Sequence, residues 1–169
     1  LAVNVEALKQ VIPKDLSAAE ISVRLGTTWI PQEDIQQFVM ELLTPSQYAR
    51  GKIKVRYTEF NGDWFIEDKS SDFDNVKANS TYGTKRASAY RIIEDTLNLR
   101  DTRIFDYVYD ENGNKKAVFN AKETTAAQAK QEAIKQAFQD WIWKDPERRN
   151  RLVRYYNDTF NSVRPREYD

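Results

Sequence analysis

The sequence contains no histidine and no cysteine. Without histidine there is no Ser-His-Asp or Cys-His catalysis and no histidine general acid or base. Without either residue type the usual zinc sites are excluded, and disulfides are excluded as well. Carboxylates, Lys, Tyr and Arg remain for chemistry. The composition therefore disfavours a self-contained enzyme, and it fits a reduced, cytoplasmic setting.

Long apolar runs are also missing. No stretch reaches the roughly 20 apolar residues that cross a bilayer, and the first residues lack a signal-peptide pattern, so we expect no membrane contact. Only five Gly and five Pro are present, unlike a linker or a low-complexity chain. Four Trp, nine Tyr and eight Phe supply enough buried area for a core, although 31% of the residues are charged.

Helical patterns occupy most of the chain. Ser17 and Glu20 form a capping box that predicts a helix over 18–25, which Gly26 ends. The other predicted helices have apolar residues at three- and four-residue spacing, or a run of good helix formers. They cover 31–43, 85–97, 123–144 and a last stretch from Asp145-Pro146 through Phe160.

Two hairpins interrupt the helices. Residues 53–66 form strands around Asn61-Gly62, which predicts a tight turn, and residues 103–119 do the same around Asn112-Gly113. Helices and strands do not alternate as β-α-β units. We therefore predict an α+β fold: a single, mostly helical domain over 1–169, with two antiparallel β-hairpins and a long C-terminal helix pair.

The first two predicted helices and the first hairpin follow the order of a winged helix-turn-helix module. In such a module the second helix enters the major groove and needs cations to meet phosphate. This helix has no Lys or Arg; its polar residues are Gln32, Glu33, Asp34, Gln36, Gln37 and Glu41. We interpret the arrangement as a structural helix pair beside a hairpin.

The formal charge is zero but uneven, because residues 77–103 carry six basic and three acidic side chains. Residues 81–86 of this segment stand where a loop is predicted to enter a helix. Free amides, hydroxyls, a glycine and two cations suit an anion there, so Tyr82, Lys85 and Arg86 are candidate phosphate contacts. The spacing is not that of a Walker loop. A solvated turn with an aromatic anchor is the alternative.

A second set of candidate phosphate contacts is the arginines of the last helix and the residues beyond it. They are Arg148, Arg149, Arg151, Arg154, Arg164 and Arg166. The alternative is an ordinary solvated face on which these arginines pair with Asp145, Glu147 and Asp158.

Carboxylates gather at three places, each of which could suggest magnesium. These are Asp72 with Asp74, Glu94 with Asp95, and Asp110 with Glu111. Each pair falls in a turn or on a helix face, where acids are ordinary, and no second ligand set accompanies it. We assign no catalytic residue and no metal ligand, and a small carboxylate-metal hydrolase is the least favoured hypothesis.

Five blocks of sequence carry a resemblance to a known group of proteins. They are Ile21–Pro31 (ISVRLGTTWIP), Thr81–Thr84 (TYGT), Asp145–Arg149 (DPERR), Tyr156–Asn161 (YNDTFN) and Arg164–Asp169 (RPREYD). Together they resemble the segment between the adenine-specific DNA methyltransferase part and the Swi/Snf-type (superfamily II) helicase part of very large proteins of bacterial mobile elements and phages.

This resemblance implies an accessory domain excised from a longer protein, and the abrupt ends of the chain agree with that expectation. ATP with Mg²⁺ and S-adenosylmethionine would bind only in the flanking domains, because this chain has no Gly-Lys-Ser/Thr loop, Asp-Glu-x-His box or Asn-Pro-Pro-Tyr/Phe motif. The expected partners are DNA, through weak backbone contacts, and the flanking domains. The alternative is a purely structural spacer without DNA contact, whose Trp141, Trp143 and Tyr168 pack on its neighbours.

Overall fold

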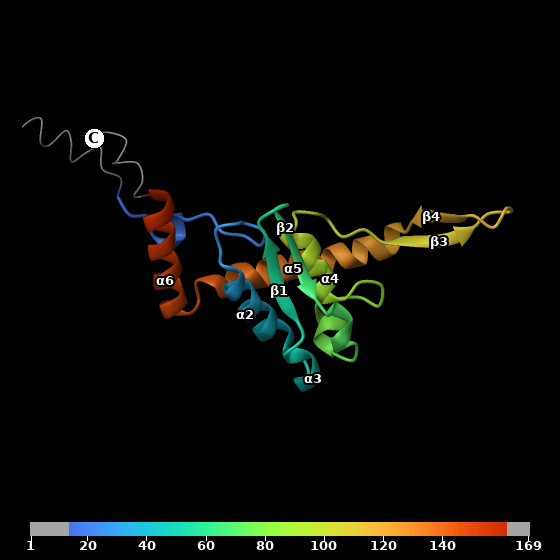
Figure 1. Ribbon diagram of the computed structural model, residues 1–169, viewed down its shortest axis with the longest axis horizontal. Helices are drawn as coiled ribbons and strands as arrows, with labels where there is room; N and C mark the ends of the chain where they lie inside the picture. The colour runs from blue at the N-terminus through green and yellow to red at the C-terminus, as the bar shows by residue number, and fades with distance from the viewer. Residues whose placement is uncertain (1–13, 162–169) are drawn as a thin grey trace, which may run out of the picture. The chain divides into compact units, whose positions relative to one another are not determined.

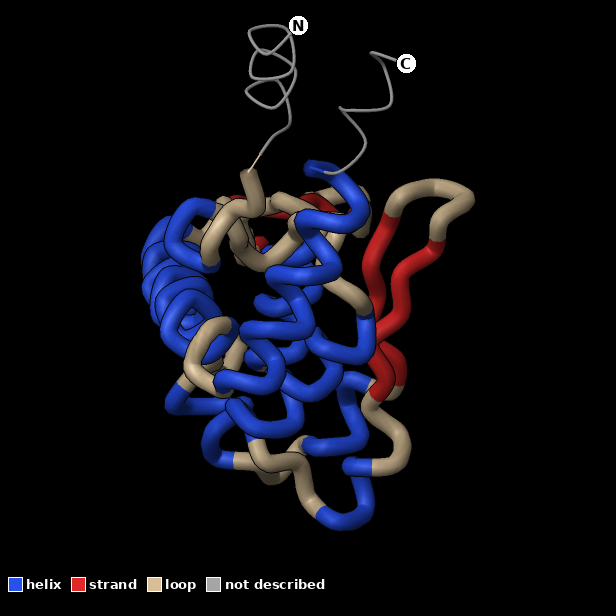
Figure 2. The backbone as a smooth tube through the Cα atoms, turned by 90° about the vertical axis from the view of Figure 1, so that its left-hand side faces the viewer, coloured by secondary structure: helices blue, strands red, loops and turns tan. Residues whose placement is uncertain are grey.

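A computed structural model of the chain describes residues 14–161. Most of this backbone is helical, and its strands form two separate antiparallel pairs (Figure 2). The predicted α+β class, the two hairpins and the C-terminal helix pair are confirmed. Contacts divide the described chain into two compact units. The central unit is Arg24–Gln139, and the terminal unit holds the described residues up to Val23 together with those from Asp140.

The terminal unit begins with a short 3₁₀ turn, η1 (Ala18–Glu20), where a helix over 18–25 was expected. The capping box does form, since the Glu20 carboxylate accepts from the Ser17 N–H at 3.0 Å. The helix fails to continue because Ile21 and Val23 are buried while Ser22 is exposed. This alternation has the period of extended chain, and it overrides the capping signal.

Helix α6 (Pro146–Tyr156) and the π-helical turn η4 (Asn157–Asn161) complete the terminal unit. The Asp145 carboxylate caps α6 by accepting from the Arg148 N–H at 2.9 Å, as the Asp-Pro sequence predicts. Asn157 is buried, and its amide pairs with both backbone groups of Leu16, at 2.7 Å to the N–H and 2.9 Å to the carbonyl. One side chain thus attaches the N-terminal segment to the last helix.

The central unit has two hairpins and several helices (Figure 1). In chain order its elements are α2 (Gln32–Leu43), α3 (Gln47–Arg50), β1 (Lys54–Thr58), β2 (Asp63–Glu67), η2 (Lys69–Asp72), η3 (Lys77–Thr81), α4 (Ala89–Leu97), β3 (Phe105–Tyr109), β4 (Lys115–Phe119) and α5 (Ala121–Ile142), whose last three residues belong to the terminal unit. Within residues 14–161 no helix is both long enough and apolar enough to cross a membrane.

The core of the central unit lies where α2, α4 and α5 supply their apolar stripes. Phe38 of α2 and Phe138 of α5 are fully buried and meet edge to face, with ring centroids 5.0 Å apart. Ile92 and Ile93 come from α4, and Ile134 adds a further residue of α5. Large rings in such edge contacts contribute more than their buried area alone.

On both outer edges of the first hairpin, helix side chains make hydrogen bonds to the backbone groups that no neighbouring strand satisfies. On the β1 edge, Gln36 of α2 accepts from the Val55 N–H at 2.6 Å and donates to the Ile53 carbonyl at 2.8 Å, while Gln32 accepts from the Tyr57 N–H at 3.0 Å. Four helical residues rise about 6 Å, close to the roughly 6.7 Å between alternate residues of a strand. Side chains four apart on α2 can therefore match successive outward groups of β1.

The β2 edge is closed in the same way by α4. The Glu94 carboxylate accepts from the Ile66 N–H at 2.8 Å, and the Asn98 amide pairs with both the N–H and the carbonyl of Trp64 at 2.8 Å. The loop between the strands is longer than predicted. Thr58 pairs with Asp63, so Asn61-Gly62 ends a four-residue connection in which only Gly62 of the pair has a positive φ.

The second hairpin extends away from the helices of the central unit (Figure 1). Phe105 pairs with Phe119 and Tyr109 with Lys115, across a loop that contains Gly113 at positive φ. Both strands are largely exposed, including Tyr109 at 71% and Phe119 at 51%. An isolated two-stranded hairpin is marginal in water, and such exposed aromatic surface is a signature of binding.

Candidate functional site

The predicted anion loop, residues 81–86, is held by its own hydrogen bonds. The Thr84 hydroxyl accepts from the N–H groups of Arg86 (3.1 Å) and Ala87 (3.0 Å), and the Thr84 N–H donates to the Ala87 carbonyl at 2.8 Å. These amides are therefore not offered to a phosphate. Helix α4 starts at Ala89 rather than at Lys85, because Ser88 is its cap.

Gly83, the glycine of this loop, has a packing role inside the protein. It is buried, and a Cβ atom at this position would lie 2.0 Å from the Ala78 carbonyl oxygen and 2.9 Å from the Ala89 nitrogen. Both neighbours are backbone, so they cannot turn aside. Glycine is required here because two backbone segments pass close to it.

The side chains of the predicted loop differ in exposure and in hydrogen bonding. Tyr82 is half-buried and Lys85 is exposed. Arg86 donates to the Asp106 carboxylate at 2.7 Å and to the Phe105 carbonyl at 3.0 Å, which ties the loop to the base of β3. Hydrogen bonds from Arg86 and then Asn120 hold the pKa of the Asp106 carboxyl below its usual range. Arg86 already has an anionic partner.

Arg148 of the predicted stripe is buried, with 6% of its surface exposed. Its guanidinium donates to the carbonyls of Trp141 and Ile142 and lies 3.5 Å from the centre of the Trp141 ring. It thus satisfies the last carbonyls of α5, as a cation at a helix C-terminus should. Arg148 is therefore not exposed to a ligand.

The other described arginines of α6 differ in their surroundings. Arg154 bridges Asp15 at 2.8 Å and Asp158 at 2.8 Å, and its hydrogen bond keeps the pKa of the Asp15 carboxyl low. Arg149 donates to the Trp143 carbonyl at 3.3 Å, and Arg151 is exposed. Arg164 and Arg166, like Tyr168, lie outside the described residues.

Each pair of carboxylates that could suggest magnesium includes at least one member with structural partners. Asp72 is 2% exposed and accepts from Tyr90, Asn75 and the Ser46 N–H. Burial alone would raise the pKa of the Asp72 carboxyl, but these hydrogen bonds outweigh it and lower that pKa. Glu94 closes β2, and Asp110 accepts from two amides of the second hairpin's loop. Residues 14–161 contain no group of three carboxylates placed to hold a metal.

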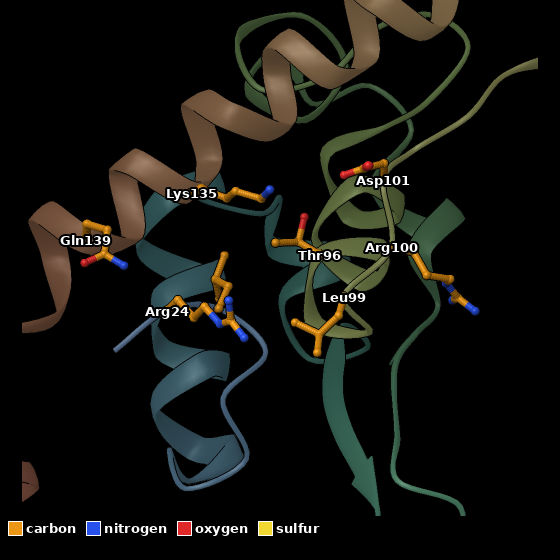
Figure 3. Close-up of a pocket in the computed structure, with 8 residues that line it drawn as sticks. Arg24, Thr96, Leu99, Arg100, Asp101, Lys135 and Gln139 are labelled. Atoms are coloured by element: carbon orange, nitrogen blue, oxygen red, sulfur yellow. The ribbon is translucent and has the colours of Figure 1, made fainter. Parts of the chain in front are cut away.

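Two adjoining hollows in the central unit gather cations that the sequence did not single out. The first, about 430 Å³, is lined by Arg24, Leu25, Thr96, Leu99, Arg100, Asp101, Lys135 and Gln139 (Figure 3). The second, about 510 Å³, is lined by Arg91, Asp95, Arg100, Asp101, Arg103 and Phe105. Arg100 and Asp101 line both hollows, and we call the combined lining of the two the basic surface. It has five cations and two carboxylates.

Helix α5 positions part of the basic surface. Its side chains make hydrogen bonds to the backbone of residues 100–104, as a neighbouring strand would do. Gln131 accepts from the Thr102 N–H at 3.1 Å and donates to the Arg100 carbonyl at 2.9 Å, and Thr124 accepts from the Ile104 N–H at 2.8 Å. Thr102 and Ile104 are therefore buried against α5. The intervening Arg103 side chain, on the opposite side of this extended segment, is exposed.

The cations of the basic surface differ in how far they are already engaged. Arg91 donates to the carbonyls of Arg86 (3.3 Å) and Arg103 (2.9 Å), which uses two of its five N–H donors. The exposed Arg100 guanidinium lies 3.8 Å from the half-buried Asp95 carboxylate, which is a long distance for an ion pair. Within residues 14–161 neither Arg24 nor Arg103 has an ion pair. Guanidinium groups that have no ion pair within the protein can donate two N–H groups to one phosphate.

The sequence contained a partial signal for the basic surface. The charge excess of residues 77–103 pointed to Arg91, Arg100 and Arg103 without naming them. The residue order Asp-Thr-Arg-Ile-Phe over 101–105 does not alternate between polar and apolar, so it gave no sign that Arg103 lies on an exposed face. Arg24 and Lys135 come from distant segments, and only the fold brings them to the same hollow.

Comparison with known proteins gives one match. No curated protein and no solved structure matches the chain. A family model described as a domain of unknown function (DUF8437) matches residues 24–162. The match starts at the first residue of the central unit and includes the whole basic surface. Because it spans well over half of the sequence, the chain belongs to this family of domains of unknown function, DUF8437.

Proposed function

We propose that this chain is a non-catalytic accessory domain of a large bacterial DNA methylase–helicase and that it contacts the DNA backbone through the basic surface. The observation that carries the DNA contact is the grouping of Arg24, Arg91, Arg100, Arg103 and Lys135 around the two hollows with only two carboxylates. Cations concentrated in a concave surface attract polyanions more strongly than scattered ones. The placement beside methyltransferase and helicase parts, and hence in the bacterial cytoplasm, rests on the resemblance of the sequence blocks.

The test is duplex DNA binding by the full chain, measured by fluorescence anisotropy at about 50 mM and about 200 mM salt. We expect weak binding whose affinity falls steeply with salt, because phosphate neutralisation releases counterions. The triple change Arg24→Gln, Arg100→Gln and Arg103→Gln should lower the slope of log affinity against log salt by about 0.9 for each phosphate contact removed.

A charge-matched control uses the exposed residues Arg50, Lys52 and Arg56, each changed to Gln. These lie outside the basic surface, so the salt slope should stay near that of the unchanged chain. Equal losses in both triple variants would mean that net charge alone attracts DNA. No binding at about 50 mM salt would contradict the DNA contact altogether.

A purely structural spacer is the second candidate, favoured by the exposed apolar surface of β3 and β4. A spacer needs such surface to pack on neighbouring domains. Of the residues expected to serve this role, Trp141 and Trp143 are half-buried and Arg148 covers the Trp141 ring, while Tyr168 lies outside the described residues. A chain that binds no DNA but binds a flanking domain through β3 and β4 would establish this alternative.

A further inference from the structure

The second hairpin has two chemically different faces. Because paired residues of an antiparallel hairpin share a face, the register places four aromatic rings together: Phe105, Tyr107, Tyr109 and Phe119. The opposite face carries Asp106, Val108, Lys116 and Val118. We call the first the aromatic face. All four of its rings are at least 36% exposed, so it is not a core surface.

Cations accompany the rings of the aromatic face. The Lys115 ammonium lies 4.2 Å from the centre of the Tyr107 ring, and the Arg103 guanidinium lies 5.8 Å from the centre of the Phe105 ring. The one acid within the paired strands, Asp106, is on the other face and bound to Arg86. The aromatic face is therefore positive in charge, although residues 104–121 as a whole carry three acids and two lysines.

The aromatic face is continuous with the basic surface. Arg103 and Phe105 line the second hollow, and they occupy alternate positions of the same extended segment that continues into Tyr107 and Tyr109. Successive side chains on one face of such a segment are about 6.7 Å apart. The cations of the basic surface are thus followed directly by a row of exposed rings.

From this juxtaposition we infer that the aromatic face binds unpaired bases, so that the chain recognises single-stranded nucleic acid at a junction with the backbone held by the basic surface. In a duplex the base faces are covered by their neighbours, whereas in a single strand they can stack on aromatic side chains. Cations beside the rings neutralise the phosphates between those bases. This inference rests on the proposed function, and it adds that the ligand has a single-stranded part.

The experiment compares labelled oligo(dT) with a duplex of the same length, both binding to the full chain. Changing Tyr107→Leu together with Tyr109→Leu keeps apolar bulk but removes two rings. We expect oligo(dT) affinity to fall at least about tenfold, because each stacked base contributes appreciably to binding. Duplex affinity should change less than about twofold. The pair Tyr107→Phe and Tyr109→Phe, which retains the rings, should bind oligo(dT) like the unchanged chain.

A matched control on the opposite face is Val108→Ala with Val118→Ala, which should leave both affinities unchanged. Circular dichroism and urea unfolding report whether each variant is folded. A measurement that needs no variant is photocrosslinking of oligo(5-iodouridine) to the unchanged chain, followed by peptide mass spectrometry. Crosslinks should fall on Tyr107, Tyr109 or Phe119, and crosslinks confined to other segments would overturn the inference.

The outcomes separate this inference from the proposed function. If duplex binds with the expected salt slope but the Leu pair leaves oligo(dT) affinity intact, the inference fails and the backbone contact stands. If neither nucleic acid binds, both fail. If sedimentation shows self-association that the Leu pair abolishes, and oligo(dT) does not compete, the aromatic face docks a second copy of the chain and the inference is overturned.

Discussion

The two hairpins have strands of the same length and the same antiparallel pairing, but one is covered by helices and the other is exposed. In β1–β2 the outward backbone groups of both strands meet side chains of α2 and α4, and Val55, Trp64 and Ile66 are buried. In β3–β4 every residue except Asp106 is exposed. The contrast separates two uses of one motif. The first hairpin stabilises the fold, and the second presents a surface.

The largest expected difference comes from removing apolar bulk. Ile66→Ala, in the covered hairpin, should lower the free energy of unfolding by about 2–5 kcal/mol, because it leaves a cavity in a packed site. Val118→Ala, in the open hairpin, should change it by less than about 0.5 kcal/mol. Urea unfolding of both variants measures the two values. Similar losses would mean that the second hairpin is also part of the core.

A smaller effect is expected from opening one edge of β1. Gln36→Ala leaves the Val55 N–H and the Ile53 carbonyl without their partner, and an unsatisfied buried group costs about 1–3 kcal/mol. Gln37→Ala, at the exposed next position of α2, is the control and should be near neutral. If the two variants unfold at the same urea concentration, water replaces the glutamine and the edge closure contributes little.

The smallest effect concerns the base of the open hairpin. The pKa of the Asp106 carboxyl is low mainly because Arg86 donates to it, so Arg86→Gln should raise that pKa toward its usual value near 3.8. A lowered folded-state pKa means that the carboxylate stabilises the fold above the unfolded pKa, and this contribution is lost as pH falls through the folded pKa. An NMR titration of Asp106 measures the shift. An unchanged pKa would show that Asn120 alone holds the carboxylate.

Local sequence patterns were sufficient for the elements that depend on local physics. The Asp145-Pro146 start of α6, the run of helix formers in α5 and the two hairpins all follow from residue order. The helix expected over 18–25 was wrong, because the burial of Ile21 and Val23 requires an extended chain. Capping chemistry could not reveal that requirement.

The candidate site was harder to predict because its residues acquire their roles only in three dimensions. Arg148 and Arg149 are neighbours in sequence, yet only Arg148 is buried, where it closes the end of α5. The glycine of the predicted anion loop, Gly83, lies where two backbone segments of the protein approach each other closely. The polar residues Gln32 and Gln36 led to the prediction of a structural helix rather than a DNA-reading one, but nothing in their spacing disclosed that they bind β1.

The amide pairing of α2 with β1 also has a consequence for alignment. Sliding β1 by one residue would turn its inward-facing groups toward Gln32 and Gln36 and move Val55 off the buried side. Helix α2 therefore favours one register of β1, because the spacing of its two glutamines matches the outward backbone groups in that register only. The hairpin can remain correctly aligned even though its connecting loop is four residues long and only weakly specifies the pairing.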